Sequence, residues 1–164
     1  MKLFYILLLL LFNVLNASEI NVSSIITLEN NIPSKCGINF QIMSTENYDV
    51  SVVIKKDADV GTLTSFSVSS LESKIRKANI VTSSENINSI IKMNNLSKKD
   101  YFVESASDEN ATAQFFQELL ISGANIIINK KKYEVIGPID SKVRLEYLFC
   151  TGEMFLPNYE KNKQ

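Results

Sequence analysis

Alternating apolar and polar positions run through the first half of the chain. Between Gly37 and Met43 the apolar residues Ile38, Phe40 and Ile42 are each separated by one other residue. Because side chains two positions apart lie on the same face of a strand, this spacing predicts a β-strand with one buried face. Serine and threonine fill many of the alternate positions, as expected where the second face of an antiparallel sheet meets water. Similar strands are predicted over residues 48–54, 63–68, 75–81 and 101–104. Residues 18–31 are expected to form either a first strand or a lead-in segment held against the domain, and Pro33 is expected to end it.

Helical spacing replaces this alternation later in the chain. From Ala111 to Ser122 apolar residues recur every three or four positions, which places them on one face of an α-helix. Ser107 or Asp108 can cap the start of this helix, and Gly123 stands where a left-handed C-terminal cap is expected. A last helix is predicted after Asp140. Its apolar face consists of Val143, Tyr147, Cys150 and Met154.

Two weaker patterns complete the predicted elements. Isoleucines recur at helical spacing within residues 84–96, so a short helix with a serine cap is predicted there. Isoleucine-rich stretches at 124–128 and 133–136 predict a hairpin that turns at Asn129 and the lysines after it. Gly137-Pro138 ends the second strand of that hairpin.

Residues 1–17 have the pattern of a secretory signal peptide. A basic start is followed by an unbroken apolar run, Leu3–Phe12, and by a more polar stretch that ends at Ala17. Cleavage is expected after Ala17, which leaves Ser18 as the first residue of an exported protein. The competing interpretation is a membrane anchor, but a spanning helix needs about 20 apolar residues and Asn13 interrupts this run well before that. We expect a mature chain with no membrane span, in the periplasm or, alternatively, outside the cell.

Length and element order together predict a single globular domain. At 164 residues, 45% of them hydrophobic, the chain can form one ordinary core but hardly two. We expect this α+β domain to cover residues 18–157, followed by a polar tail over 158–164. Its predicted architecture is an antiparallel sheet covered on one face by two or three helices.

Cys36 and Cys150 are the two cysteines of the chain, and they lie near opposite ends of the mature sequence. An oxidising compartment allows two such thiols to form a disulfide, which we predict. A bridge closing a loop of this length stabilises by roughly 4–5 kcal/mol in the chain-entropy model. The alternative is two buried free cysteines that act as small apolar side chains. A metal site is disfavoured, because two cysteines without histidine lack the usual number of ligands.

Composition excludes several kinds of chemistry. The chain has no histidine, which removes Ser-His-Asp and Cys-His nucleophiles and histidine metal ligands. An enzyme would have to use carboxylates, lysine, tyrosine or serine. The 17 basic and 18 acidic residues give a net charge of −1, too little to attract nucleic acid. We therefore assign no catalytic, cofactor-binding or metal-binding residue and expect no cofactor and no nucleic-acid partner.

Two local motifs resemble functional signatures without completing them. The segment from Asp57 to Gly61 begins like a calcium loop, but its glycine comes one position early and Val68 stands where the bidentate glutamate belongs, so a hairpin turn is the better interpretation. Ser89 and Lys92 match the Ser-x-x-Lys pattern of penicillin-recognising enzymes. The rest of that signature is absent, so we interpret the pair as neighbours on a helix.

Carboxylates offer a third possible chemistry. Asp108 and Glu109 are adjacent, but their place at a helix start is explained by the helix dipole. Glu146 is expected to form an exposed i,i+4 pair with Lys142. Glu118 is predicted to be isolated, with no partner that shifts its pKa, and so is Glu134.

The last third of the chain combines several features in a fixed order: the helix through Phe115-Phe116-Gln117-Glu118-Leu119-Leu120, its late Gly123, the short hairpin, Gly137-Pro138 and the helix that carries Cys150. In this order of features it resembles small exported proteins of Gram-negative bacteria. Such proteins are mostly uncharacterised, so the resemblance implies a periplasmic location and assigns no catalytic residue.

The predicted export and disulfide, together with the lack of a catalytic motif, favour a binding function over an enzymatic one. We expect a non-enzymatic binding or interaction module of the cell envelope, whose partner is an envelope protein or a small ligand. The alternative is a small hydrolase that uses carboxylates in a cleft, or a soluble ligand carrier. Two carboxylates sharing a concave pocket would favour the hydrolase, whereas an exposed apolar surface would favour partner binding.

Overall fold

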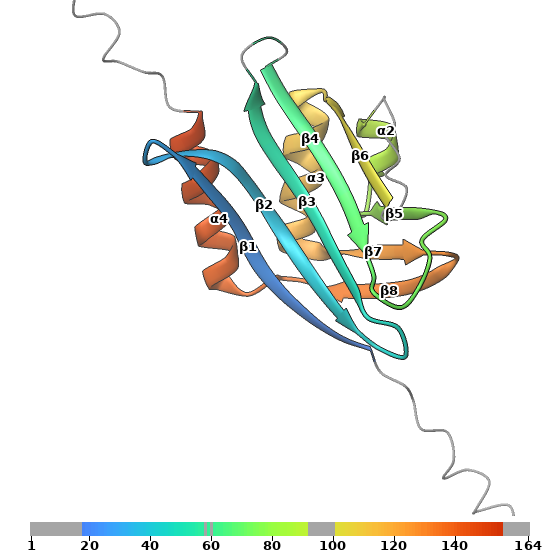
Figure 1. Ribbon diagram of the computed structural model, residues 1–164. Coiled ribbons are helices and arrows are strands. Elements are labelled where there is room, and N and C mark those ends of the chain that lie inside the picture. The colour runs from blue at the N-terminus through green and yellow to red at the C-terminus, as the bar shows by residue number, and fades with distance from the viewer. Residues whose placement is uncertain (1–17, 58, 60, 92–100, 156–164) are drawn as a thin grey trace, which may run out of the picture.

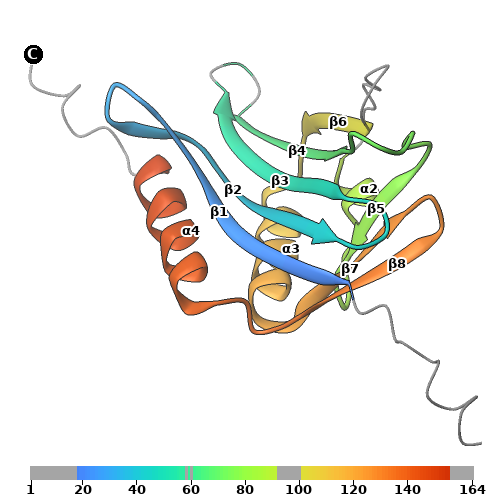
Figure 2. The same cartoon turned by 60° about the horizontal axis from the view of Figure 1, so that its bottom comes forward.

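The computed structural model describes residues 18–57, 59, 61–91 and 101–155. The predicted signal peptide and the polar tail lie outside these ranges. The described residues form one five-stranded and one three-stranded antiparallel sheet, with two long helices on the same side of the larger sheet (Figure 1, Figure 2). The predicted α+β fold is therefore confirmed. The elements are β1 (Glu19–Glu29), β2 (Ile32–Met43), β3 (Tyr48–Asp57), β4 (Gly61–Ser69), β5 (Ala78–Val81), α2 (Ile87–Ile90), β6 (Tyr101–Ala106), α3 (Glu109–Ser122), β7 (Gly123–Ile128), β8 (Lys131–Ile136) and α4 (Ser141–Met154).

The larger sheet has the strand order β1-β2-β3-β4-β6, so β1 to β4 follow one another as in the sequence, and β6 lies beside β4 because β5 belongs to the smaller sheet. One row of paired residues crosses four of these strands: Ile38, Val52, Phe66 and Val103. All four side chains are buried beneath the helices, as the alternating pattern predicted. Burial of such a row is the main driving force for sheet packing, at about 25 cal/mol per Å2 of apolar surface.

The opposite face of this sheet is polar. The hydroxyls of Ser51 and Ser67 lie 2.7 Å apart across β3 and β4. On the same face Lys55 forms an ion pair with Glu104, with 3.0 Å between the ammonium and carboxylate atoms. The prediction that this sheet has one buried face and one face in contact with water is confirmed.

The first hairpin corrects the predicted role of Pro33. β1 ends at Glu29, and the chain turns at Asn30 and Asn31, which have φ angles of 53° and 63°. Asparagine tolerates this left-handed conformation better than most residues, so the asparagines and not the proline set the turn. Pro33 lies inside β2, paired with Leu28 where the register shifts.

The predicted fourth strand over residues 75–81 is shorter than expected and lies in the other sheet. β5 begins only at Ala78, and the order of the smaller sheet is β5-β7-β8. The cause is a long-range contact, in which the amide of Asn129 accepts from the backbone of Arg76 at 2.8 Å and donates to the carbonyl of Lys74 at 2.8 Å. These bonds carry the segment away from β4 to the hairpin formed by β7 and β8.

The predicted caps of both long helices are confirmed. Asp108 precedes α3 and accepts from the backbone of Ala111 at 2.9 Å, whereas Asp140 precedes α4 and accepts from Lys142 at 2.9 Å. Gly123 has a φ of 83° and ends α3 at the point where β7 begins. Such caps satisfy backbone groups that the helix itself leaves unpaired.

The predicted short helix is only partly confirmed. α2 contains four residues, and its cap is Asn86 in place of a serine. Residues 92–96 of the prediction lie outside the described part of the chain. Among the helices that are described, none has both the length and the apolar character needed to cross a bilayer.

The predicted disulfide joins Cys36 in β2 to Cys150 in α4, with Cα atoms 5.8 Å apart. Both residues are buried. The bridge fixes α4 against the sheet, where it packs on β1 and β2.

Candidate functional site

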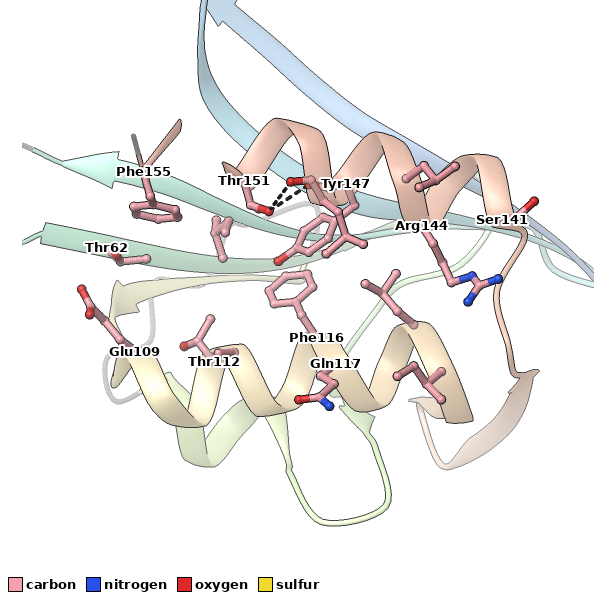
Figure 3. Close-up of a pocket in the computed structure, with 16 residues that line it drawn as sticks. Thr62, Glu109, Thr112, Phe116, Gln117, Ser141, Arg144, Tyr147, Thr151 and Phe155 are labelled. Carbon is pink, nitrogen blue, oxygen red and sulfur yellow. Dashed lines mark hydrogen bonds between the residues drawn. The ribbon is translucent and has the colours of Figure 1, made fainter. Parts of the chain in front are cut away.

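A groove runs between α3 and α4. The two helices lie side by side on the sheet, and the chain direction of α3 is opposite to that of α4 (Figure 3). The volume of the groove is about 920 Å3, within the range of about 300–1,000 Å3 that is usual for binding sites. Most of its side chains come from the facing sides of the two helices, and Ile54 of β3 and Thr62 of β4 contribute from the sheet.

The lining of the groove is mostly apolar. Phe116, Leu120 and Ile121 line it from α3, and Leu145, Tyr147 and Leu148 line it from α4. Thr151 adds little polarity, because its hydroxyl donates to the carbonyls of Tyr147 and Leu148 in its own helix at 3.0 and 3.2 Å (Figure 3). The groove therefore offers an apolar surface that fits an apolar occupant.

The rim of the groove is exposed. Leu148, Leu145 and Ile121 are 57%, 54% and 55% exposed, and Phe149 extends the same surface around α4 with 69% exposure. Isolated apolar side chains on a surface are ordinary, but a contiguous cluster marks an interaction site. We call these four exposed side chains the rim of the α3–α4 groove. The rim and the groove form one continuous apolar surface.

Phe116 and Tyr147 meet between the helices. Their rings are stacked, with centroids 4.8 Å apart and planes inclined by 17°. Burial raises the pKa of Tyr147 well above the usual value of a tyrosine, because the phenolate would lose its hydration. Tyr147 therefore stays neutral at physiological pH and adds no charge to the groove.

Opposite charges lie at the two ends of the groove. Glu109, in the first turn of α3, is at one end, and Arg144, in the first turn of α4, is at the other (Figure 3). Within the described part of the chain the Nε atom of Arg144 is buried without a hydrogen-bond partner, and so is the hydroxyl oxygen of Thr112 near Glu109. These two atoms are covered by protein, so what the groove offers to an occupant is the charge of Arg144 at one end and of Glu109 at the other.

The candidate residues found in the sequence lie mostly outside this groove. Asp57 and Gly61 are paired in the β3–β4 hairpin, which confirms the predicted turn. Nowhere in the described part of the chain do three or more acidic or cysteine side chains come together in a way that could hold a metal ion. Ser89 donates to the backbone of Asn86 at 2.7 Å, while Lys92 is outside the described residues. Glu109 alone of these candidates lines the groove.

The arrangement does not resemble a carboxylate pair. Among the described residues that line the groove, Glu109 is the one carboxylate. Its neighbour Asp108 caps α3 through the backbone of Ala111. Glu146 pairs with Lys142 at 3.8 Å, as predicted, and also accepts from the hydroxyl of Ser24 in β1. The bond from Ser24 joins α4 to the sheet.

The prediction that Glu118 is isolated is wrong. Its carboxylate accepts from the hydroxyl of Thr82 at 2.6 Å, from the hydroxyl and backbone amide of Ser84, and from the amide of Gln114 at 3.1 Å. These bonds, of which the one from the Ser84 hydroxyl has the largest effect, hold the pKa of Glu118 far below its usual value. Thr82 and Ser84 are more than 30 positions away in sequence, so local spacing could not indicate them. The cluster joins α3 to the segment before α2.

Sequence reasoning also missed the rim. The predicted inward face of α4 is confirmed as buried, but that prediction gives no role to the exposed residues Leu145, Leu148 and Phe149. A signal was present, since α4 is apolar on both sides. A helix that is hydrophobic all round is normally buried on all sides.

Fold and site together define a class: a disulfide-linked α+β protein with an apolar groove between two antiparallel helices. Comparison of the chain with protein-family models, with curated proteins and with solved structures finds no match.

Proposed function

We propose that this protein is an exported binding module of the cell envelope and that the α3–α4 groove with its rim is its contact surface. The observation that carries the proposal is the contiguous apolar surface of Ile121, Leu145, Leu148 and Phe149 beside a groove of about 920 Å3. Leaving this much apolar surface in water is unfavourable by about 25 cal/mol per Å2, and an occupant that covers it would gain that free energy.

Export rests on two further observations. Residues 1–17 follow the signal-peptide pattern, and a Cys36–Cys150 disulfide persists best in an oxidising compartment such as the periplasm. Both support a mature protein that begins at Ser18 and works outside the cytoplasm.

A soluble carrier of a small apolar ligand is the second candidate. The volume of the groove favours it, because ligand sites of this size are common. Against it, Phe149 lies outside the groove, so a small ligand would leave much of the rim exposed.

A matched pair of variants tests the proposed surface. Leu148→Glu places a charge on the rim, and Ile136→Glu places the same charge on β8, at an apolar residue that is 81% exposed and outside the groove. The oxidised protein is immobilised and incubated with envelope extract from the cells that make it. We expect a specific partner to be recovered by the wild type and by Ile136→Glu but not by Leu148→Glu. Recovery of the same proteins by all three would refute the proposal.

A further inference from the structure

Resting on the proposed binding role of the α3–α4 groove, we infer that its occupant is an amphipathic α-helix of a partner protein, with an acidic residue beside Arg144 and a basic residue beside Glu109. The inference adds the class of partner and its charge pattern to the site. Three properties of the groove support it: its backbone, its length and its two charged ends.

The backbone around the groove favours a helix over an extended segment. Both walls are helices, whose backbone groups bond within the helix. Ile54 and Thr62 lie on β3 and β4, and each of these strands is already paired with a neighbouring strand along both of its edges. An extended peptide laid here would find no strand edge, and its amides would be buried unpaired. A helix satisfies its own backbone and presents only side chains.

The dimensions of the groove suit a helix of similar length. α3 and α4 have 14 residues each, so each wall is about 21 Å long at 1.5 Å per residue. A third helix of about four turns would place apolar residues at i, i+3, i+4 and i+7 along this length, packed between the two walls. It would also cover the exposed side chains of Leu145 and Leu148.

The charges also favour an occupant with two charged ends. Among the described residues neither Glu109 nor Arg144 forms an ion pair. A carboxylate from the occupant would pair with the guanidinium of Arg144, and guanidinium–carboxylate bonds are among the stronger hydrogen bonds. A fatty acid would provide a carboxylate for Arg144 but nothing for Glu109.

The test uses two peptide display libraries of equal composition. One fixes leucines at helical spacing in 16-residue sequences, and the other fixes them at alternating positions; all other positions are random. Both are selected on the oxidised protein, with counter-selection on Leu148→Glu. We expect binders from the helical library alone, with an acid at one end and a base at the other. They should bind Ile136→Glu as well as the wild type and Leu148→Glu at least tenfold more weakly.

Charge reversal tests the ends of the groove. Arg144→Glu should weaken a selected peptide about two- to fivefold, the usual size for a rim ion pair, and changing the acid of that peptide to lysine should restore the affinity. Binders from the alternating library, or binders unaffected by a central proline, would overturn the helical occupant. If neither library yields a binder, the inference also fails. Should lauric acid then bind the wild type but not Leu148→Glu, the groove remains a binding site with a different ligand, and the proposed surface survives.

Discussion

The ring of Phe116 in α3 is stacked on the ring of Tyr147 in α4, with 4.8 Å between the ring centroids. This contact joins the two walls of the groove directly, whereas the disulfide and the sheet join them indirectly. The width of the groove at its middle is therefore set by two side chains, both of them buried.

Removal of the Phe116 ring should destabilise the protein. Phe116→Ala is expected to lower the free energy of unfolding by about 3–5 kcal/mol, because it leaves a cavity and removes the stacked pair. Phe149→Ala, on the exposed side of α4, is the matched control and should change it by no more than about 0.5 kcal/mol. Urea unfolding of the oxidised proteins measures both. Similar losses in the two variants would show that the stacked pair does not hold the helices together.

The disulfide should supply a large part of the stability. The Cys36→Ser/Cys150→Ser double variant opens a loop with a sequence separation of 114 residues and is expected to lose about 4–5 kcal/mol in the chain-entropy model. Denaturant unfolding of wild type and variant gives the difference. As a check, alkylation of the unfolded wild type without reductant should add no mass, and alkylation of both thiols would contradict the bridge.

Regular elements with local causes could be predicted from the sequence, and contacts between distant segments could not. The alternation of Ile38, Phe40 and Ile42 and the caps Asp108 and Asp140 each act within a few residues, so their roles were visible. The disulfide was predictable because two cysteines allow a single pairing. The placement of β5 was not, because it depends on bonds from Asn129 to a segment more than 50 positions earlier.

The groove itself belongs to the unpredictable part. Its walls were predicted as helices, but its existence depends on the distance between α3 and α4, which no local pattern contains. The sequence does place the apolar residues Leu145, Leu148 and Phe149 outside the predicted buried face of α4. Apolar residues in such positions indicate a surface that a partner could cover. The sequence predicts Glu109 only as a residue at a helix start, because its place in the groove depends on the tertiary structure.

Glu118 should make stability depend on acid pH. Its carboxylate has a pKa lowered from the usual 4.5 by hydrogen bonds from Ser84, Thr82 and Gln114. Below about pH 5 the unfolded chain takes up a proton that the folded protein does not, so the stabilisation present at pH 7 declines as the pH falls. Glu118→Gln should be less stable than the wild type at pH 7, and the difference should shrink toward pH 3.

Urea midpoints of the two proteins between pH 7 and pH 3 measure this effect. Glu134→Gln is the control, because the carboxylate of Glu134 accepts no hydrogen bond within the described residues. A wild type and a Glu118→Gln variant that lose stability in parallel would contradict the role of the Glu118 cluster.

Three glycines should respond differently to a single added methyl group. Gly152 lies in α4 with a φ that is not left-handed and with open space around its Cβ position, so Gly152→Ala should stabilise the protein by about 0.5–1 kcal/mol through helix propensity. Gly61 has a φ of 83° but also open space, so Gly61→Ala should cost about 1–2 kcal/mol for the left-handed conformation alone. Gly123 has the same φ, and a Cβ there would lie 2.0 Å from the carbonyl oxygen of Val135.

Gly123→Ala should therefore be the most harmful of the three. The close atom belongs to the backbone of β8, so the clash cannot be relieved by turning a side chain, and the end of α3 must separate from the hairpin. We expect a loss of more than about 2 kcal/mol, the backbone strain alone being about 1–3 kcal/mol. Thermal or urea unfolding of the three variants gives the ranking directly. A loss in Gly123→Ala no greater than that in Gly61→Ala would mean that α3 and β8 approach less closely than the structure shows.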